Sequence, residues 1–297
     1  VCVLAGAPKA VEQPQKIVVR VFDPNVLMAE LHELGFNPEE REHYEGWITA
    51  PSGLILVTGP TGSGKRTTLD GGLNTINTPE KNILTAEDPV EYELRGIGQM
   101  QVQPKIGLTF ASGLRRFLRQ DPDVIMVGEI RDLETSEISV QASLTGPRVF
   151  TTLHSNDAPS TIARLLDLGM EPFLLTATIE GIVAQRLVRT ICPRCKEQFT
   201  PTEDMLMELN LTPEAVACRS FFHGGGCEFC RHTGYSGRMA LFEMLILDDE
   251  TRTLIMDNRS TAVLREAARR GGMRALRETG LLAIYDGRTT IEEVAGQ

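Results

Sequence analysis

The chain lacks a long apolar run, and this absence excludes one class of protein. A membrane-spanning helix needs about 18–20 consecutive apolar residues. The longest candidate segment, 170–188, is interrupted by Glu171, Glu180, Gln185 and Arg186. The start of the chain also lacks the basic segment and long apolar stretch of a signal peptide. We therefore expect no direct membrane span and no secretory leader, and the first residues read as the start of a fragment.

An excess of positive charge is also missing. The 297 residues include 30 Lys and Arg against 40 Asp and Glu, a formal net charge of -10. Binding to nucleic acid or to anionic membranes needs a basic surface. We therefore expect no nucleic-acid partner, and a DNA- or RNA-translocating activity is disfavoured. Internal repeats and low-complexity tracts are absent as well, and the length suffices for a well-buried core.

Strands alternate with helices through the middle of the sequence. Residues 54–58 form a continuous apolar run, which is typical of a strand buried on both faces of a parallel sheet. A helix is expected at 65–75. The same alternation continues with strands at 82–86, 124–127 and 148–153 and helices at 109–118 and 134–144. This order predicts a three-layer α/β core.

The two ends of the chain are expected to differ from this middle part. Before the core, the pattern indicates a strand at 17–22 and helices at 25–34 and 38–47. Beyond residue 160 we expect mainly helices, broken by a cysteine-rich stretch at 191–237, and a helical end at 262–296.

A glycine-rich segment lies between the strand at 54–58 and the helix that follows it. Residues 59–65 read GPTGSGK, which is a phosphate-binding P-loop in the required strand–loop–helix context. Backbone N–H groups and the helix N-terminus attract phosphate, and Lys65 adds a point charge. The expected nucleotide-binding residues are Gly59, Pro60, Thr61, Gly62, Ser63, Gly64, Lys65, Arg66 and Thr67.

Arg66 departs from the P-loop pattern. The motif has Ser or Thr after the lysine, whose hydroxyl ligates Mg²⁺. Thr67 follows, but one helical residue is about 100° of rotation, so its hydroxyl points elsewhere. A guanidinium beside a Mg²⁺ site repels the metal. We therefore expect ATP binding with impaired turnover and weak dependence on Mg²⁺.

Acidic groups and a histidine follow the other expected strands. Glu129 ends the strand at 124–127, Glu87 ends the strand at 82–86, and His154 ends the strand at 148–153. Ligands bind beyond the carboxyl ends of strands in open α/β sheets. We expect Glu129 and Glu87 to orient water or position Mg²⁺ and His154 to contact the γ-phosphate, together with Lys65 as catalytic residues. The alternative is that these are ordinary polar strand ends.

Four of the six cysteines form two CxxC pairs. Cys192 and Cys195 make the first, and Cys227 and Cys230 the second. Two such pairs supply four thiolates to one tetrahedral ion, so we expect a closed, structural Zn²⁺ site. This use of cysteine indicates a reducing compartment rather than a disulfide framework.

Four segments resemble a known family, the secretion ATPases that power type II secretion and type IV pilus assembly. They are GPTGSGK at 59–65, TAEDPVEYE at 85–93, LRQDPDVIMVGEIRD at 118–132 and LTGPRVFTTLHSNDA at 144–158, which resemble the Walker A, Asp box, Walker B and His box. The cysteine segment beginning AQRLVRTICPRC resembles the zinc module of the secretion and pilus-extension branch, which the related retraction motors lack. The resemblance extends over 17–297 and includes GRTTIEEV near the end.

This resemblance implies a homo-hexameric ATPase with ATP, Mg²⁺ and Zn²⁺ as cofactors. It implies a cytoplasmic protein at the inner face of the bacterial inner membrane, where it moves a platform protein. The expected fold is α/β, a RecA-like P-loop NTPase core with a small zinc-binding subdomain and a helical C-terminal region. The expected division is 1–48, the remnant of a preceding domain; 49–190, the ATPase core; 191–237, the zinc subdomain; and 238–297, the helical subdomain.

Three residues depart from the family pattern. Arg66 replaces a hydroxyl residue, Pro147 replaces the first His of the His box, and Asp70 replaces an aromatic residue. The first two favour an alternative function, a nucleotide-binding subunit with weakened catalysis. The main interpretation is an active motor, supported by Glu129 and His154. The sequence offers no interpretation of Asp70.

Overall fold

The computed structural model describes residues 2–3, 19–20 and 31–296. Most of the strand expected at 17–22 and of the helix expected at 25–34 lies outside these residues. Within them, β1 (Cys2–Val3) pairs with β2 (Val19–Arg20), and a 3₁₀ helix spans Leu31–Glu33.

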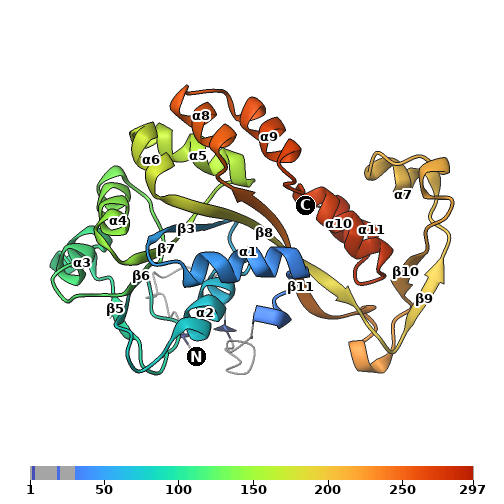
Figure 1. Cartoon of the computed structure of the whole chain (residues 1–297). Helices are drawn as coiled ribbons and strands as arrows, with labels where there is room; N and C mark the ends of the chain where they lie inside the picture. Colours follow the sequence, from blue (N-terminus) through green and yellow to red (C-terminus); the bar gives the residue numbers. More distant parts are fainter. Residues whose placement is uncertain (1, 4–18, 21–30, 297) are drawn as a thin grey trace, which may run out of the picture.

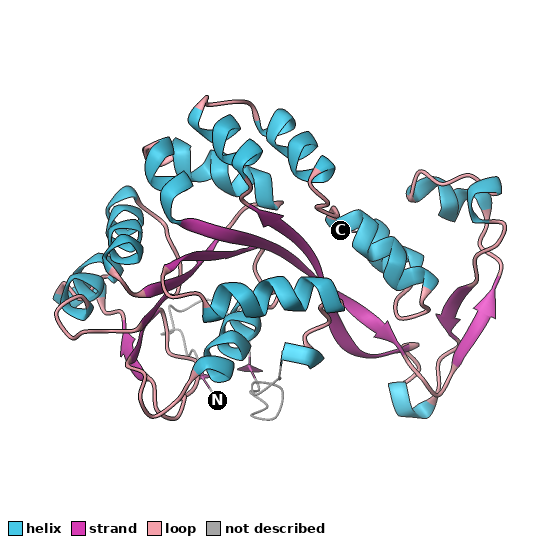
Figure 2. Cartoon of the chain, viewed as in Figure 1, coloured by secondary structure: helices cyan, strands magenta, loops and turns pink. Residues whose placement is uncertain are grey.

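A seven-stranded sheet forms the centre of the molecule (Figures 1 and 2). Its order is β11-β8-β3-β7-β6-β4-β5, and every neighbouring pair is parallel except β11 and β8. The strands are β3 (Gly53–Thr58), β4 (Ile83–Glu87), β5 (Gly98–Gln101), β6 (Val124–Val127), β7 (Arg148–Leu153), β8 (Ile179–Ile191) and β11 (Tyr235–Ile246). The four buried strands expected in the middle of the chain are confirmed to within a residue or two.

Helices cover both faces of this sheet. Side chains alternate along a strand, so Leu54 and Leu56 of β3 join one buried cluster while Ile55 and Val57 join the other. One face carries α1 (Pro38–Thr49) and α2 (Lys65–Ile76). The opposite face carries α3 (Phe110–Phe117), α4 (Leu133–Thr145), α5 (Ala158–Asp167), α6 (Pro172–Thr178), α8 (Asp249–Met256) and α9 (Thr261–Arg270). The three-layer α/β core is confirmed.

Helices account for most of the regular structure beyond residue 160, as expected, but the sequence analysis missed β8 and β11, the two longest strands described. They pair antiparallel from Ile191 and Tyr235 to Gly181 and Ile246. The β-branched residues of β8 suit a strand, but only Gly181–Gln185 form a continuous buried stretch, and arginines follow it. The irregular sequence of buried and exposed residues in β8 obscures the alternation of apolar and polar residues by which a strand is recognised. β11 also crosses the expected boundary between 237 and 238.

A smaller unit follows β8 and lies beside the end of the chain (Figure 1). β9 (Lys196–Phe199) and β10 (Phe221–Gly224) pair antiparallel, with α7 (Glu203–Glu208) between them in sequence. A third apolar cluster packs this unit against α10 (Leu276–Tyr285) and α11 (Ile291–Ala295), so the helical chain end is confirmed. Further 3₁₀ helices are Pro104–Ile106, Glu214–Val216 and Glu228–Cys230.

The segment 170–188 is divided between α6 and β8 rather than forming one helix. In the ranges that the structure describes, no helix combines the length and the apolar character needed to cross a bilayer.

Candidate functional site

The P-loop turns tightly at the carboxyl end of β3, and its glycines are required by the close approach of β8. Gly59 has φ 146°, and a Cβ there would lie 2.4 Å from the carbonyl oxygen of Gln185. Gly64 has φ 85°, and its Cβ would lie 2.8 Å from the Gln185 amide nitrogen. Only glycine tolerates both this backbone conformation and this contact.

Gln185 of β8 hydrogen-bonds to both the P-loop and α2, a role that was not predicted from the sequence. Its Nε2 donates to the carbonyl oxygen of Ser63 at 2.7 Å, and Thr68 Oγ1 donates to its Oε1 at 2.8 Å. The side chain is 1% exposed. The available signal was a polar residue directly after the apolar run Ile182–Ala184. Gln185 therefore joins the loop to the first turn of α2.

Lys65 lies over the P-loop as its motif predicts. Its Nζ donates to the carbonyl oxygens of Gly59 at 2.8 Å and Pro60 at 3.0 Å. Burial lowers the pKa of Lys65, while the nearby carboxylate of Glu129 opposes this effect and the cation of Arg186 adds to it. Two cations, Lys65 and Arg186, and the Glu129 carboxylate therefore lie close together at the P-loop.

Glu129 and His154 meet at the ends of two adjacent strands, β6 and β7. His154 Nε2 lies 3.6 Å from Glu129 Oε2, and Arg131 contacts the other carboxylate oxygen. A hydrogen bond of 2.7 Å from Thr152 Oγ1 to the Gly128 carbonyl oxygen holds the two strand ends together. The structure thus brings Glu129 and His154 together beside Lys65.

Glu87 has a different environment, although it also ends a strand. Its side chain is 1% exposed, and Oε2 lies 2.7 Å from Arg66 Nη1. Oε1 accepts hydrogen bonds from Thr85 Oγ1 at 2.5 Å and from Gln99 Nε2 at 3.0 Å. A general base needs direct reach to its substrate or to a water molecule. The structure therefore places the Glu87 carboxylate in a buried ion pair with Arg66.

Arg66 contacts Asp70 as well as Glu87. Its Nε lies 2.8 Å from Asp70 Oδ2, one turn further along α2, and the Tyr92 hydroxyl donates to the same oxygen. The Asp70 side chain is fully buried. Burial raises the pKa of Asp70, against the effect of Arg66. Burial alone lowers the pKa of Arg66, but Asp70 and Glu87 together raise it above its ordinary value.

The residues here do not fit Mg²⁺ at the position that the P-loop motif assigns to it. The hydroxyl ligand is replaced by a guanidinium whose Nη2 is buried and lacks a hydrogen-bond partner among the described residues. A buried cationic donor cannot ligate a metal ion and repels it electrostatically.

Pro147 and His154 lie at opposite ends of β7, so Pro147 is on the side of the sheet away from this site. It precedes β7, whereas His154 follows the same strand of 6 residues. At about 3.3 Å per residue, the two are about 20 Å apart. The expectation that Pro147 weakens turnover is therefore not supported by its position.

The four cysteines of the two CxxC pairs converge at the base of the β9–β10 hairpin. Their Sγ atoms all lie within 4.8 Å of one another. The contacts are 3.9 Å for Cys192 and Cys227, 3.8 Å for Cys195 and Cys230, and 3.7 Å for Cys227 and Cys230. Zn–S bonds of about 2.3 Å in a tetrahedron place sulfurs about 3.8 Å apart. The geometry therefore fits one Zn²⁺.

The sulfur of Cys230 is also prepared for metal binding by backbone donors. The backbone N–H groups of Cys227 and Gly234 donate to its Sγ at 3.2 and 3.3 Å. The Cys227 hydrogen bond is the main cause that lowers the pKa of Cys230 to about 6. Thiolates are the form of cysteine that binds zinc.

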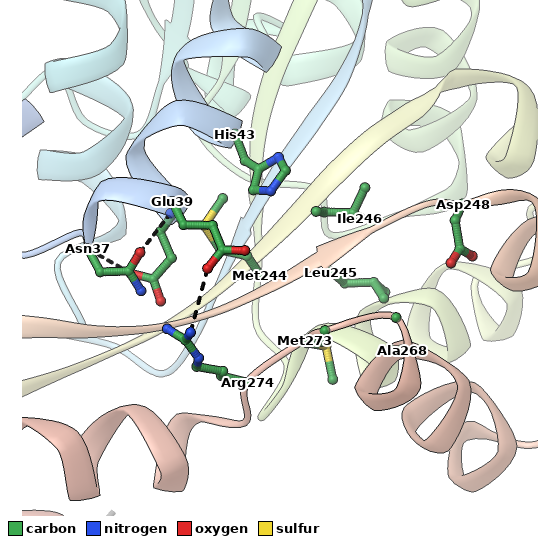
Figure 3. Close-up of a pocket in the computed structure, with 13 residues that line it drawn as sticks. Asn37, Glu39, His43, Met244, Leu245, Ile246, Asp248, Ala268, Met273 and Arg274 are labelled. Carbon is green, nitrogen blue, oxygen red and sulfur yellow. Dashed lines mark hydrogen bonds and ion pairs between the residues drawn. The ribbon is translucent and has the colours of Figure 1, made fainter.

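A cavity of about 150 Å³ lies elsewhere, between α1, β11 and the segment after α9 (Figure 3). Glu39 and Arg274 form an ion pair of 3.5 Å at its rim, and His43 lines the side formed by α1 (Figure 3). Neither the P-loop nor the ends of β6 and β7 contribute to its lining. This cavity is separate from the candidate nucleotide site.

Relatives in curated collections are similar over nearly the whole chain. The type II secretion system protein E of Dickeya dadantii is 48% identical over 281 residues, which are 94% of this chain and 55% of that protein. The type IV pilus assembly ATPase PilB of Thermus thermophilus is 48% identical over 280 residues, which are 94% of this chain and 32% of that protein. The chain thus spans from about a third to about half of these relatives' lengths.

Solved structures agree with this relationship. The pilus retraction motor PilT with bound ADP has a TM-score of 0.67 and 31% identity, over 90% of this chain and 66% of that chain. The ATPase DotB of Legionella pneumophila has a TM-score of 0.65 and 25% identity, over 90% of this chain and 64% of that chain. A model of the family described as type II/IV secretion system protein matches residues 4–296. The chain therefore belongs to the type II/IV secretion system protein family.

Proposed function

We propose that this chain is the ATP-hydrolysing motor part of a type II secretion or type IV pilus assembly machine. The observation that carries the proposal is the contact of Glu129 with His154 at the ends of β6 and β7, with Lys65 of the P-loop close enough to Glu129 for an electrostatic interaction. Family membership and the names of the relatives support ATP as the nucleotide. The same names favour the motor over a subunit with weakened catalysis.

Each residue of the site has a role in this proposal. The loop 59–64 and Lys65 bind the β- and γ-phosphates, because backbone N–H groups and an ammonium group suit phosphate oxygens. Glu129 orients and activates the attacking water, and His154 contacts the γ-phosphate and steadies the Glu129 carboxylate. Glu87 acts indirectly, because its carboxylate is buried against Arg66.

The wider assembly is proposed from the resemblance. The chain forms a ring of six at the cytoplasmic face of the inner membrane and reaches the membrane through a platform protein. The division into a preceding-domain remnant (1–48), ATPase core (49–190), zinc subdomain (191–237) and C-terminal subdomain (238–297) is part of this proposal, with β11 contributing to the core sheet. The cysteine cluster holds a structural Zn²⁺.

Phosphate release from ATP by the purified chain tests the proposal. Glu129→Gln is expected to lower turnover by about 100-fold or more, since it removes the base but keeps the shape of the site. Binding of ATP should persist in that variant. Glu266→Gln, which changes an exposed carboxylate of α9, is the matched control and should leave turnover unchanged. Equal turnover in Glu129→Gln and the unmodified chain would contradict the assignment.

A further inference from the structure

Arg148, the first residue of β7, is a buried arginine without a negative partner. The residue is 5% exposed, and its Nε is buried and has no hydrogen-bond partner among the described residues. Burial lowers the pKa of Arg148, and no carboxylate in the described part of the chain opposes this effect. Arg66, by contrast, contacts two buried carboxylates. A buried charge is unfavourable unless it is paired, so Arg148 calls for a counter-ion that the described fold does not supply.

The register of the sheet places Arg148 far from the nucleotide site. Arg148 pairs with Gly53 of β3 and with Val124 of β6, at the amino-terminal ends of these strands. Side chains alternate along a strand, so Arg148 lies on the same face as Phe150, which is the face that α1 and α2 cover. His154 follows the opposite end of β7. The guanidinium therefore serves neither the P-loop nor the Glu129–His154 contact.

A pocket of about 810 Å³ opens beside Arg148 at this end of the sheet. Pockets that bind small molecules have volumes of about 300–1,000 Å³. The other charged residues of its lining are Lys81, Asp121 and Asp123. Both aspartates are exposed, and Asp123 Oδ2 already accepts the backbone N–H of Asn82 at 2.7 Å. The pocket thus combines a second cation, Lys81, with a buried cation that neither aspartate neutralises.

We propose that this pocket binds a small organic anion and that Arg148 is the cation that anchors its phosphate or carboxylate group. A guanidinium suits such a group because its N–H donors match two oxygens at once. Lys81 adds positive charge to the same pocket. The inference goes beyond the proposed function, because it assigns a second ligand site on the side of the sheet away from the P-loop.

Thermal unfolding in potassium phosphate, acetate and chloride of matched ionic strength and pH tests the inference. A ligand that binds only the folded chain raises Tm. At about ten times its dissociation constant, the bound anion should raise the Tm of the unmodified chain by about 2 °C or more above the value in chloride. Arg148→Leu should lose this increase. Its Tm in chloride should not fall, because leucine removes an unpaired charge and keeps an apolar side chain in the same place.

Two further variants make the test specific. Arg148→Lys keeps a cation at the pocket and should retain part of the increase in Tm. Arg119→Leu changes an exposed arginine outside the pocket and should retain all of it. An increase with phosphate alone identifies a phosphate group as the ligand, and an increase with acetate identifies a carboxylate group.

The comparison between Arg148→Leu and the unmodified chain decides the outcome, because phosphate at the P-loop would stabilise both chains equally. An increase that only the leucine variant lacks supports the site. Equal increases in the two chains, or no increase in the unmodified chain with either anion, overturn the inference. Both of these results leave the proposed function intact, since no residue of the pocket takes part in it.

Discussion

At the scale of single residues, the P-loop depends on a side chain from a strand that lies far away in sequence. Gln185 satisfies a loop carbonyl group and a hydroxyl of α2 at once, in a fully buried position. The sequence alone identified the loop because its glycines and lysine are contiguous. It could not identify Gln185, because that partnership exists only once β8 lies beside β3.

Replacement of Gln185 by leucine should weaken nucleotide binding more than it slows the chemical step. The change leaves the Ser63 carbonyl group and the Thr68 hydroxyl without partners, and each unsatisfied buried group costs about 1–3 kcal/mol. We therefore expect KM to rise by about tenfold or more while kcat changes less. Steady-state kinetics measure both values.

Two comparisons make the Gln185 prediction specific. Gln198→Leu, on the exposed face of β9, should leave KM unchanged. Gln185→Glu keeps the acceptor for Thr68 but loses the donor to Ser63 and buries a negative charge beside the P-loop, so its KM should rise at least as much as that of the leucine variant. An unchanged KM in Gln185→Leu would show that the loop keeps its shape without this support.

For Arg66, the sequence predicted one property of the side chain but not its contacts. Its conflict with a Mg²⁺ ligand followed from the motif. Its two ion-pair partners could not be predicted. Glu87 lies on β4, far from Arg66 in sequence, and the role of Asp70 is clear only from its contact with the Arg66 guanidinium.

At the scale of secondary-structure elements, the strands buried on both faces were predictable and the two longest strands were not. β3 and β6 are short apolar runs bounded by turns, which is a clear signal for a parallel sheet. β8 and β11 extend beyond the core, so their burial changes along their length. β8 and β11 are stabilised along their length by pairing with one another, and a contact between segments so far apart in sequence is not visible in the local sequence pattern.

The four cysteines lie at one end of the β9–β10 strand pair, next to the strand ends that the proposed Zn²⁺ would hold together. Chelation of Zn²⁺ should release about one ion per chain and expose the backbone of the β9–β10 strand pair near the cysteines to hydrogen exchange, because the metal ties the two CxxC segments together. Nucleotide binding should persist, since the cysteines are separate from the P-loop. Cys195→Ser should reproduce the loss, whereas Cys218→Ser, at an exposed cysteine outside the cluster, should not. A metal-free chain with full hairpin protection would rule out a structural zinc.

At the scale of the whole molecule, the sheet order explains the position of the site. β3, β7 and β6 are consecutive parallel neighbours. Lys65, His154 and Glu129 follow the carboxyl ends of these strands and therefore lie on the same side of the sheet. This convergence was predictable from the alternation of strands and helices. The distance of Pro147 from the site follows from the same geometry, because it lies at the other end of β7.

A crystal structure of the chain with a non-hydrolysable ATP analogue tests the central claim, the convergence of these residues on the phosphates, most directly. We predict that Lys65 Nζ leaves the carbonyl oxygens of Gly59 and Pro60 and lies about 3 Å from a phosphate oxygen. Glu129 and His154 should face the terminal phosphate. Phosphates bound away from the P-loop, for example in the cavity beside α1, would contradict the account.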